Sequence, residues 1–137
     1  MVIGYTTGVF DLFHIGHLNM LRNASEMCDK LIVGVTTDEL VSYKGKTAVI
    51  PFHERLEIVR NIKCVDAAIP QLDMDKLGAQ ERLKFDIMFV GSDWYGTEKW
   101  RKIEDTLKER HVRVVYFPYT QGTSSTLINA TLESLRG

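Results

Sequence analysis

The chain has 137 residues, of which 45% are hydrophobic and 26% charged, with a formal net charge of -1 at pH 7 and a pI of about 6.4. This length and hydrophobic content suffice for one domain with a full core, over residues 1–137, and are too small for two. A net charge close to zero, without a long run of basic residues, argues against a nucleic-acid partner or binding to an anionic membrane surface.

The two cysteines, Cys28 and Cys64, are far apart and belong to no CxxC pair or Cys/His cluster. They predict reduced thiols rather than a disulfide framework or a zinc site. Met1 is followed directly by an apolar segment, with no basic leader and no stretch of membrane-spanning length. We therefore expect a soluble cytoplasmic protein.

An apolar, β-branched run over residues 2–7 predicts the first strand. It leads into Gly-Val-Phe-Asp-Leu-Phe-His-Ile-Gly-His over residues 8–17, and a helical apolar pattern follows over residues 18–27. The middle stretch is therefore a strand-to-helix turn. Turns of this kind lie at the carboxyl edge of a parallel sheet, where ligands bind.

Two histidines stand out in this turn. His14 and His17 are three residues apart, which places both imidazoles on one face of the first helical turn. The unpaired N–H groups and positive dipole of a helix start favour an anion, above all a phosphate. Gly16 permits close approach of a ligand, and Asp11 adds a carboxylate. This set suits chemistry on a phosphate that gains charge in its transition state, whereas the plain alternative is one capping histidine and one surface histidine.

Residues 30–36 form a nearly continuous apolar run, which predicts a strand covered on both faces. Thr37 then has the pattern of an N-cap, beginning a short helix that ends at Tyr43. Two successive β-α units indicate a doubly wound sheet. In the next loop Lys44 and Lys46 flank a glycine and could contact a triphosphate, although a solvated turn with incidental lysines fits equally well.

Pro51 is well placed as the first residue of the following helix. The charged residues Arg55 and Lys63 are then candidates for the site or for a partner surface. The core face of this helix is expected to consist of three apolar residues, Ile58, Val59 and Ile62.

The third strand is predicted over residues 65–69, where Pro70 ends it. Residues 71–84 indicate a loop and an amphipathic helix whose charges face solvent. The fourth strand is predicted over residues 85–90.

The turn after the fourth strand, residues 91–96, again lies at the carboxyl edge and carries Asp93 and Trp94. The tryptophan could stack on a nucleobase or seal the next helix against the sheet, as lone aromatics more often do. A helix over residues 97–109 and a fifth strand over residues 112–117 follow.

The loop after Pro118 is rich in hydroxyl groups and opens a final helix that extends through Leu135. Its hydroxyl and N–H groups could hold phosphate oxygens, whereas an ordinary serine N-cap would use only one hydroxyl. Right-handed crossovers would bring this loop and the histidine turn together around the first strand. The chain therefore predicts a Rossmann-like, doubly wound α/β domain with a five-stranded parallel sheet in the order 3-2-1-4-5.

Together these motifs resemble the cytidylyltransferase family of the HxGH nucleotidyltransferase superfamily, most closely its members that act on glycerol 3-phosphate. The likeness covers nearly the whole chain, and the order and spacing of its motifs are specific. They are Gly8-x-Phe10-Asp11-x-x-His14-x-Gly16-His17, Thr37-Asp38-Glu39, Lys44 and Lys46, His53-Glu54-Arg55, Val65-Asp66, Gly91-x-Asp93-Trp94, and Thr120-x-Gly122-x-Ser124.

The resemblance implies that a phosphomonoester oxygen attacks the α-phosphorus of CTP in line, giving a CDP-alcohol and pyrophosphate, with Mg²⁺ bound mainly through the triphosphate. His14 and His17 would stabilise charge on the α-phosphate, and Lys44 and Lys46 would bridge the triphosphate and the acceptor. Asp11 would orient the site or the water shell of Mg²⁺.

The resemblance also implies that Arg55 and Lys63 line the acceptor side and that the chain forms a homodimer. Its product would enter the synthesis of teichoic acid, capsule or a phospholipid head group, and the sequence leaves these three open. The implied nucleotide contacts are Gly8, Val9, Phe10, Gly16, Asp93, Trp94, Thr120, Gly122, Ser124 and Ser125.

Three positions depart from the family pattern. Tyr119 stands where the family usually has arginine, Lys63 where the glycerol 3-phosphate enzymes tend to have arginine, and Met74 where they often have tryptophan. These changes leave the predicted fold and enzyme class as they are. They leave open the identity of the acceptor and, to a lesser degree, that of the nucleotide base. Two alternatives follow: an adenylyltransferase of the same superfamily acting on a sugar phosphate or similar acceptor, and a non-catalytic nucleotide-binding module.

Overall fold

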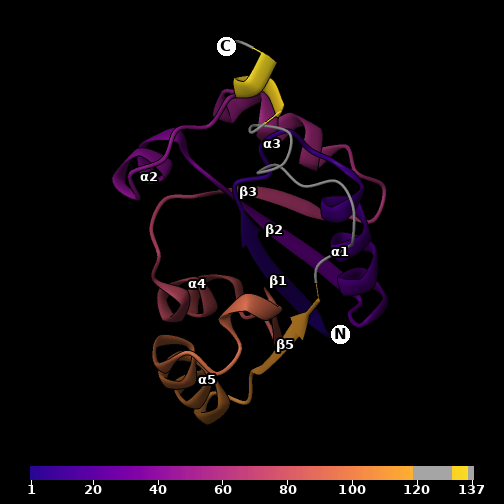
Figure 1. Ribbon diagram of the computed structural model, residues 1–137. Coiled ribbons are helices and arrows are strands. Elements are labelled where there is room, and N and C mark those ends of the chain that lie inside the picture. The colour runs from indigo at the N-terminus through magenta and orange to yellow at the C-terminus, as the bar shows by residue number, and fades with distance from the viewer. Residues whose placement is uncertain (119–130, 136–137) are drawn as a thin grey trace.

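The computed structural model describes residues 1–118 and 131–135. The strands in these residues are β1 (Ile3–Gly8), β2 (Lys30–Thr36), β3 (Ala67–Gln71), β4 (Ile87–Gly91) and β5 (Arg113–Phe117). They form one parallel sheet in the order β3-β2-β1-β4-β5 (Figure 1), which confirms the predicted doubly wound α/β fold.

The helices connect successive strands. They are α1 (Ile15–Glu26), α2 (Asp38–Tyr43), α3 (Phe52–Arg60), α4 (Lys76–Leu83) and α5 (Glu98–Glu109), with a 3-10 turn, η1 (Ser92–Trp94), after β4. Residues 131–135 are also helical, and the remainder of the predicted final helix lies outside the described residues. No helix in the described part of the chain is both long enough and apolar enough to cross a bilayer.

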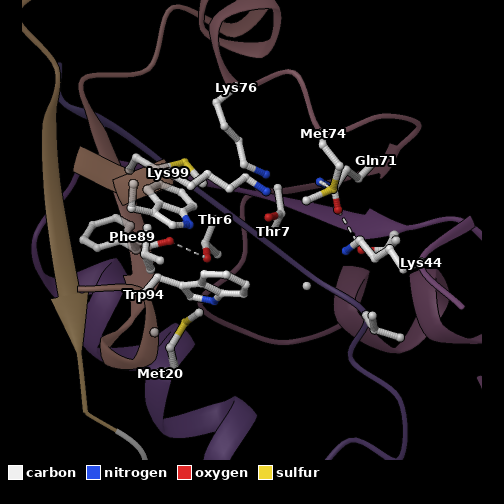
Figure 2. A pocket seen from close by; sticks show the side chains of 17 residues that line it. Thr6, Thr7, Met20, Lys44, Gln71, Met74, Lys76, Phe89, Trp94 and Lys99 are labelled. Atoms are coloured by element: carbon white, nitrogen blue, oxygen red, sulfur yellow. Dashed lines mark hydrogen bonds between the residues drawn. The ribbon is translucent and has the colours of Figure 1, made fainter. Parts of the chain in front are cut away.

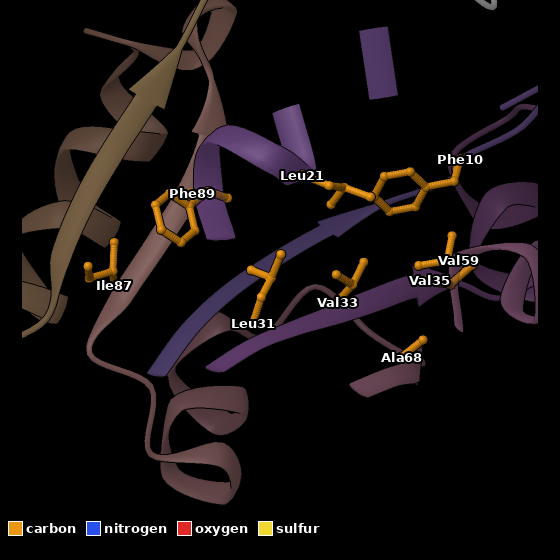
Figure 3. Close-up of a cluster of buried hydrophobic side chains, with 10 residues drawn as sticks. Phe10, Leu21, Leu31, Val33, Val35, Val59, Ala68, Ile87 and Phe89 are labelled. Carbon is orange, nitrogen blue, oxygen red and sulfur yellow. The ribbon is translucent and has the colours of Figure 1, made fainter. Parts of the chain in front are cut away.

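Two hydrophobic clusters cover the two faces of the sheet. Because successive side chains of a strand point to opposite faces, β2 contributes to both clusters, which explains its continuous apolar sequence. In the first cluster, α1 and α3 pack on the sheet (Figure 3), through Leu21, Ala24 and Val59 on Leu31, Val33 and Val35. In the second, α4 and α5 pack on the opposite face, through Ala79, Trp100 and Leu107 on Ile32, Met88 and Val90.

The central strands β1 and β4 diverge toward their carboxyl ends. They are in register only over residues 4–5 and 87–88, although each strand continues for three more residues. Beyond the register the hydroxyl of Thr6 donates to the carbonyl of Phe89 at 3.0 Å, so a buried side chain makes a bond that the ladder no longer supplies. This divergence occurs where the strand order reverses, and such a point opens a crevice for ligands.

Two details of the predicted elements are wrong. Pro70 lies inside β3, opposite Val35, rather than at its end. An edge strand tolerates proline because one of its sides has no neighbouring strand that needs the missing N–H.

The predicted core face of α3 is wrong at Ile58. This residue is 44% exposed, whereas Arg55 and Val59, four residues apart, face the interior.

Arg55 is buried, with 1% of its surface exposed. Its Nε donates to the carbonyl of Ile50, and its Nη1 donates to the carbonyls of Val9 and Thr36, at 2.7 to 2.8 Å. Its Nη2 forms a 2.6 Å ion pair with the carboxylate of Asp38. The guanidinium therefore joins the ends of β1 and β2 to the segment before α3.

Lys63 lies at the other edge of the sheet. It is exposed in the turn after α3, three residues before Asp66, whose N–H donates to the carbonyl of Leu31 at the start of β2. Arg55 is thus enclosed by its hydrogen-bond partners, and Lys63 lies before β3, away from the carboxyl ends of the strands, so the acceptor role of each stays a prediction.

The bonds of Arg55 lead to a stability prediction. Arg55→Met would leave three carbonyls and a carboxylate without this donor, so we expect the free energy of unfolding to fall by about 3 kcal/mol or more. Urea denaturation measures the change. Arg60→Met, which removes an exposed pair with Glu57, is the matched control and should change stability by about 0.5 kcal/mol or less. An Arg55→Met protein as stable as the control would contradict the structural role.

Candidate active site

The turn between β1 and α1 is conformationally strained. Phe10 and Leu12 have positive φ angles of 55° and 50°, which are costly for residues other than glycine. A Cβ atom at Gly8 would lie 2.9 Å from the ring of Phe10, so this position requires glycine. The strain and the close packing set the direction in which the chain enters α1, and with it the position of the histidines.

Main-chain hydrogen bonds fix both imidazoles. His14 caps α1 by accepting from the N–H of Gly16 on Nδ1 at 3.0 Å, and Nδ1 of His17 accepts from the N–H of His14 at 3.2 Å. The ring centroids are 4.0 Å apart, as the spacing predicts. Because both Nδ1 atoms accept, each neutral ring carries its proton on Nε2. His14 is a cap, as the plain alternative expects, but His17 is held against it and is not an unrelated surface residue.

Burial keeps these rings neutral. It lowers the pKa of His17 to about 4, the neighbouring His14 lowers it further, and Asp11 opposes the shift. Burial also lowers the pKa of His14. The rings of Phe10 and Phe13 pack around His17, with centroids 5.5 and 5.2 Å away. At pH 7 the pair therefore supplies two neutral N–H donors next to a helix N-terminus.

Asp11 orients the neighbouring loop. Its buried carboxylate accepts from the N–H groups of Val49 and Ile50 at 2.8 and 2.9 Å. These bonds tie the histidine turn to the loop that carries Lys44 and Lys46. The carboxylate thus has a positioning role in the site.

A cavity of about 210 Å³ lies where β1 and β4 diverge (Figure 2). Residues 6–9 of β1 and its turn and residues 88–91 of β4 line it on the strand side. Three lysines line it from different elements: Lys44 from the end of α2, Lys76 from the first turn of α4, and Lys99 from α5. Since residues 8–9 also begin the histidine turn, the cavity and the histidines are neighbours at one sheet edge.

Lys76 differs from the prediction that the charges of its helix are solvated. Its side chain is buried, with 7% of the residue exposed. Burial lowers the pKa of Lys76 to about 8, Lys44 and Lys99 lower it further, and Asp73 opposes them. One sequence signal was available, because a cation in the first turn of a helix opposes the helix dipole.

Trp94 lies in the turn that follows β4, at the end of η1. It is 47% exposed and lines the cavity, and the ammonium group of Lys99 is 5.9 Å from the centroid of its ring. Trp94 is therefore not a core residue, in contrast to the buried Trp100. Asp93 is exposed in the same turn. The predicted nucleotide-binding residues Thr120, Gly122, Ser124 and Ser125, together with Tyr119, lie outside the described residues.

The histidine geometry leads to a spectroscopic prediction. In the free protein we expect the ring of His17 to titrate at about pH 4, well below 6.5, with its neutral form protonated on Nε2. Nitrogen-detected NMR across pH 3–8 measures both. Between about pH 6.5 and 4 the unfolded imidazole binds a proton that the folded one does not, so this group's contribution to stability falls as pH falls. A His17 titration near pH 6.5 would contradict the buried neutral ring.

Comparison with known proteins agrees with this geometry. The cytidylyltransferase-like family model matches residues 5–131. A glycerol-3-phosphate cytidylyltransferase of Bacillus spizizenii is 36% identical over 131 residues, covering 95% of this chain and 96% of that protein. An FAD synthase of Archaeoglobus fulgidus is 38% identical over 106 residues, covering 77% and 75%.

Among solved structures, the lipopolysaccharide core biosynthesis protein of Thermoplasma volcanium superposes with a TM-score of 0.74 at 26% identity, covering 90% of this chain and 99% of that one. The sequence relatives, the family model and the observed strand order agree with one another. The chain belongs to the cytidylyltransferase-like family and is a nucleotidyltransferase.

Proposed function

We propose that this protein transfers CMP from CTP to a small phosphomonoester of the glycerol 3-phosphate type and releases pyrophosphate. One observation carries the proposal: two neutral imidazole donors at a helix N-terminus adjoin a lysine-lined cavity at the point where the strand order reverses. The likeness to glycerol-3-phosphate cytidylyltransferases over almost the whole chain supports the nucleotide and the acceptor type.

In this proposal the histidines act on the α-phosphate. An oxygen of the acceptor phosphate forms a bond to the α-phosphorus, while the bond from that phosphorus to the bridging oxygen of the β-phosphate breaks. Charge develops on the α-phosphate oxygens, where the Nε2–H groups of His14 and His17 donate. Such preorganised donors act without having to reorient during the reaction, and this electrostatic stabilisation is a main source of rate.

The loop lysines supply positive charge beside the donors. The pKa of Lys44 is lowered by burial and by Lys46 and Lys99, which indicates that several cations share this region. We propose that Lys44 and Lys46 bridge the triphosphate and the reacting phosphate of the acceptor, and that Asp11 holds their loop in place. Asp93 and Trp94 are proposed for the nucleoside.

A divalent metal fits this site as part of the nucleotide. No cluster of three or more His, Cys, Asp or Glu side chains that could hold a metal ion occurs within residues 1–118 and 131–135. We propose that Mg²⁺ enters on the triphosphate oxygens, and we assign no step to a protein-bound metal.

Adenylyl transfer is the second candidate. The likeness to FAD synthases over about three quarters of the chain supports it, because those proteins belong to the adenylyl-transferring alternative. The two candidates share the histidine pair and differ in the base and the acceptor.

The proposed role of the histidine pair has a kinetic test. We expect His17→Ala to lower kcat by about 100-fold, with a smaller change in KM for CTP, because a donor to the transition state is lost. His111→Asn is the control. This histidine is exposed at the opposite edge of the sheet and has a positive φ, which asparagine tolerates. Normal turnover by His17→Ala would rule out the role.

The substrates have a direct test. Pyrophosphate release is measured with Mg²⁺ and either CTP or ATP, each crossed with glycerol 3-phosphate, phosphocholine, phosphoethanolamine and FMN. We expect turnover with CTP and glycerol 3-phosphate. Turnover with ATP and FMN alone would move the protein to the adenylyltransferase branch, and nucleotide binding without pyrophosphate release would indicate a non-catalytic module.

A further inference from the structure

Lys76 is a buried cation without an anionic contact. With 93% of its surface covered, it has no hydrogen bond or ion pair with any residue in 1–118 or 131–135, and Asp73 influences its charge only at longer range. In Figure 2 it extends into the cavity toward Lys99. Burying an ammonium group near other ammonium groups is unfavourable unless an anion neutralises them. This arrangement of charges favours a negatively charged ligand in the cavity.

The lysines and the histidines approach the cavity from opposite faces of the sheet. The histidines begin α1, which packs on the first face, whereas Lys76 and Lys99 belong to α4 and α5, which pack on the second. The cavity passes between the diverging ends of β1 and β4, and Met20 of α1 lines it together with Trp100 of α5. A molecule whose phosphate reacts at the histidine turn would thus extend its far end toward Lys76.

We propose that Lys76, assisted by Lys99, binds an anionic group at the far end of the acceptor, so that the preferred acceptor carries a carboxylate or a second phosphate besides the phosphate that reacts. The inference rests on the proposed function and specifies its acceptor class. Lys44, on the α2 side of the cavity, serves the reacting phosphate. A terminal hydroxyl, as in glycerol 3-phosphate, would leave the two deeper lysines without a counter-charge.

Matched acceptors test this directly. Glycerol 3-phosphate and 3-phosphoglycerate have the same three-carbon length but end in a hydroxymethyl group and a carboxylate, and glucitol 6-phosphate and 6-phosphogluconate form a longer pair. With CTP and Mg²⁺ we expect kcat/KM to be about tenfold or more higher for the anionic member of at least one pair, since hydrogen bonds to charged groups are the stronger ones. Equal or lower values for the anionic members of both pairs would overturn the proposal.

The Lys76→Met variant tests whether Lys76 causes the preference for anionic acceptors. We expect it to abolish the preference, lowering kcat/KM for the anionic acceptor by about tenfold or more and changing it less than about twofold for the hydroxyl acceptor. Lys102→Met, on the exposed side of α5, is the control. An equal loss for both acceptors would mean that Lys76 binds the reacting phosphate. A loss confined to KM for CTP would place the nucleotide there, and either result would overturn the proposal.

Direct binding separates this inference from the proposed function. Calorimetric titration of 3-phosphoglycerate and 6-phosphogluconate into wild type and Lys76→Met needs no turnover. Tighter binding than that of the hydroxyl partners, lost in the variant, supports the anion site even if CTP is not consumed. Binding that does not depend on Lys76, with CTP turnover intact, overturns the anion site and leaves the cytidylyltransferase function standing.

Discussion

The divergence of β1 and β4 is the constraint on which the rest of this structure depends. After two residues in register the strands separate, and the Thr6 hydroxyl satisfies the Phe89 carbonyl that a continued ladder would have paired. The separation creates the cavity in the middle of the sheet. Because the connecting helices lie on opposite faces on either side of this point, residues from both helix layers line one cavity (Figure 1).

Burial lowers the pKa of both the histidine and the lysine at this edge of the sheet, but it leaves them in opposite charge states at pH 7. It lowers the pKa of His17 to about 4 and that of Lys76 to about 8. At pH 7 the first group is neutral and donates from Nε2, while the second is still mostly protonated and attracts anions. One physical effect thus provides uncharged donors on one side of the cavity and cations on the other.

Several charged residues of the motifs are structural supports. Arg55 and Asp11 both lie in segments that predict a ligand contact, and each makes hydrogen bonds to main-chain groups of the loops around the site. Arg55 joins the ends of β1 and β2, and Asp11 joins the histidine turn to the lysine loop. Both buried charges therefore hold loops of the site in place.

The sequence by itself determined the fold class, the strand order and the pairing of His14 with His17. These follow from local periodicity, from turn chemistry and from the handedness of crossovers, all of which act over short stretches of chain. It also indicated the family, because the order of the motifs spans nearly the whole chain.

Only the tertiary structure decided which cations reach the cavity. A lysine in an amphipathic segment has much the same local pattern whether its ammonium group faces solvent or a ligand. A position in the first turn of a helix is an unusual place for a cation, but it does not say what the ammonium group faces. In the same way, the pattern around Arg55 does not separate a buried support from a ligand contact. The outcome depends on where the first turns of α4 and α5 meet the diverging strands. That is a long-range property of packing, which no local pattern encodes.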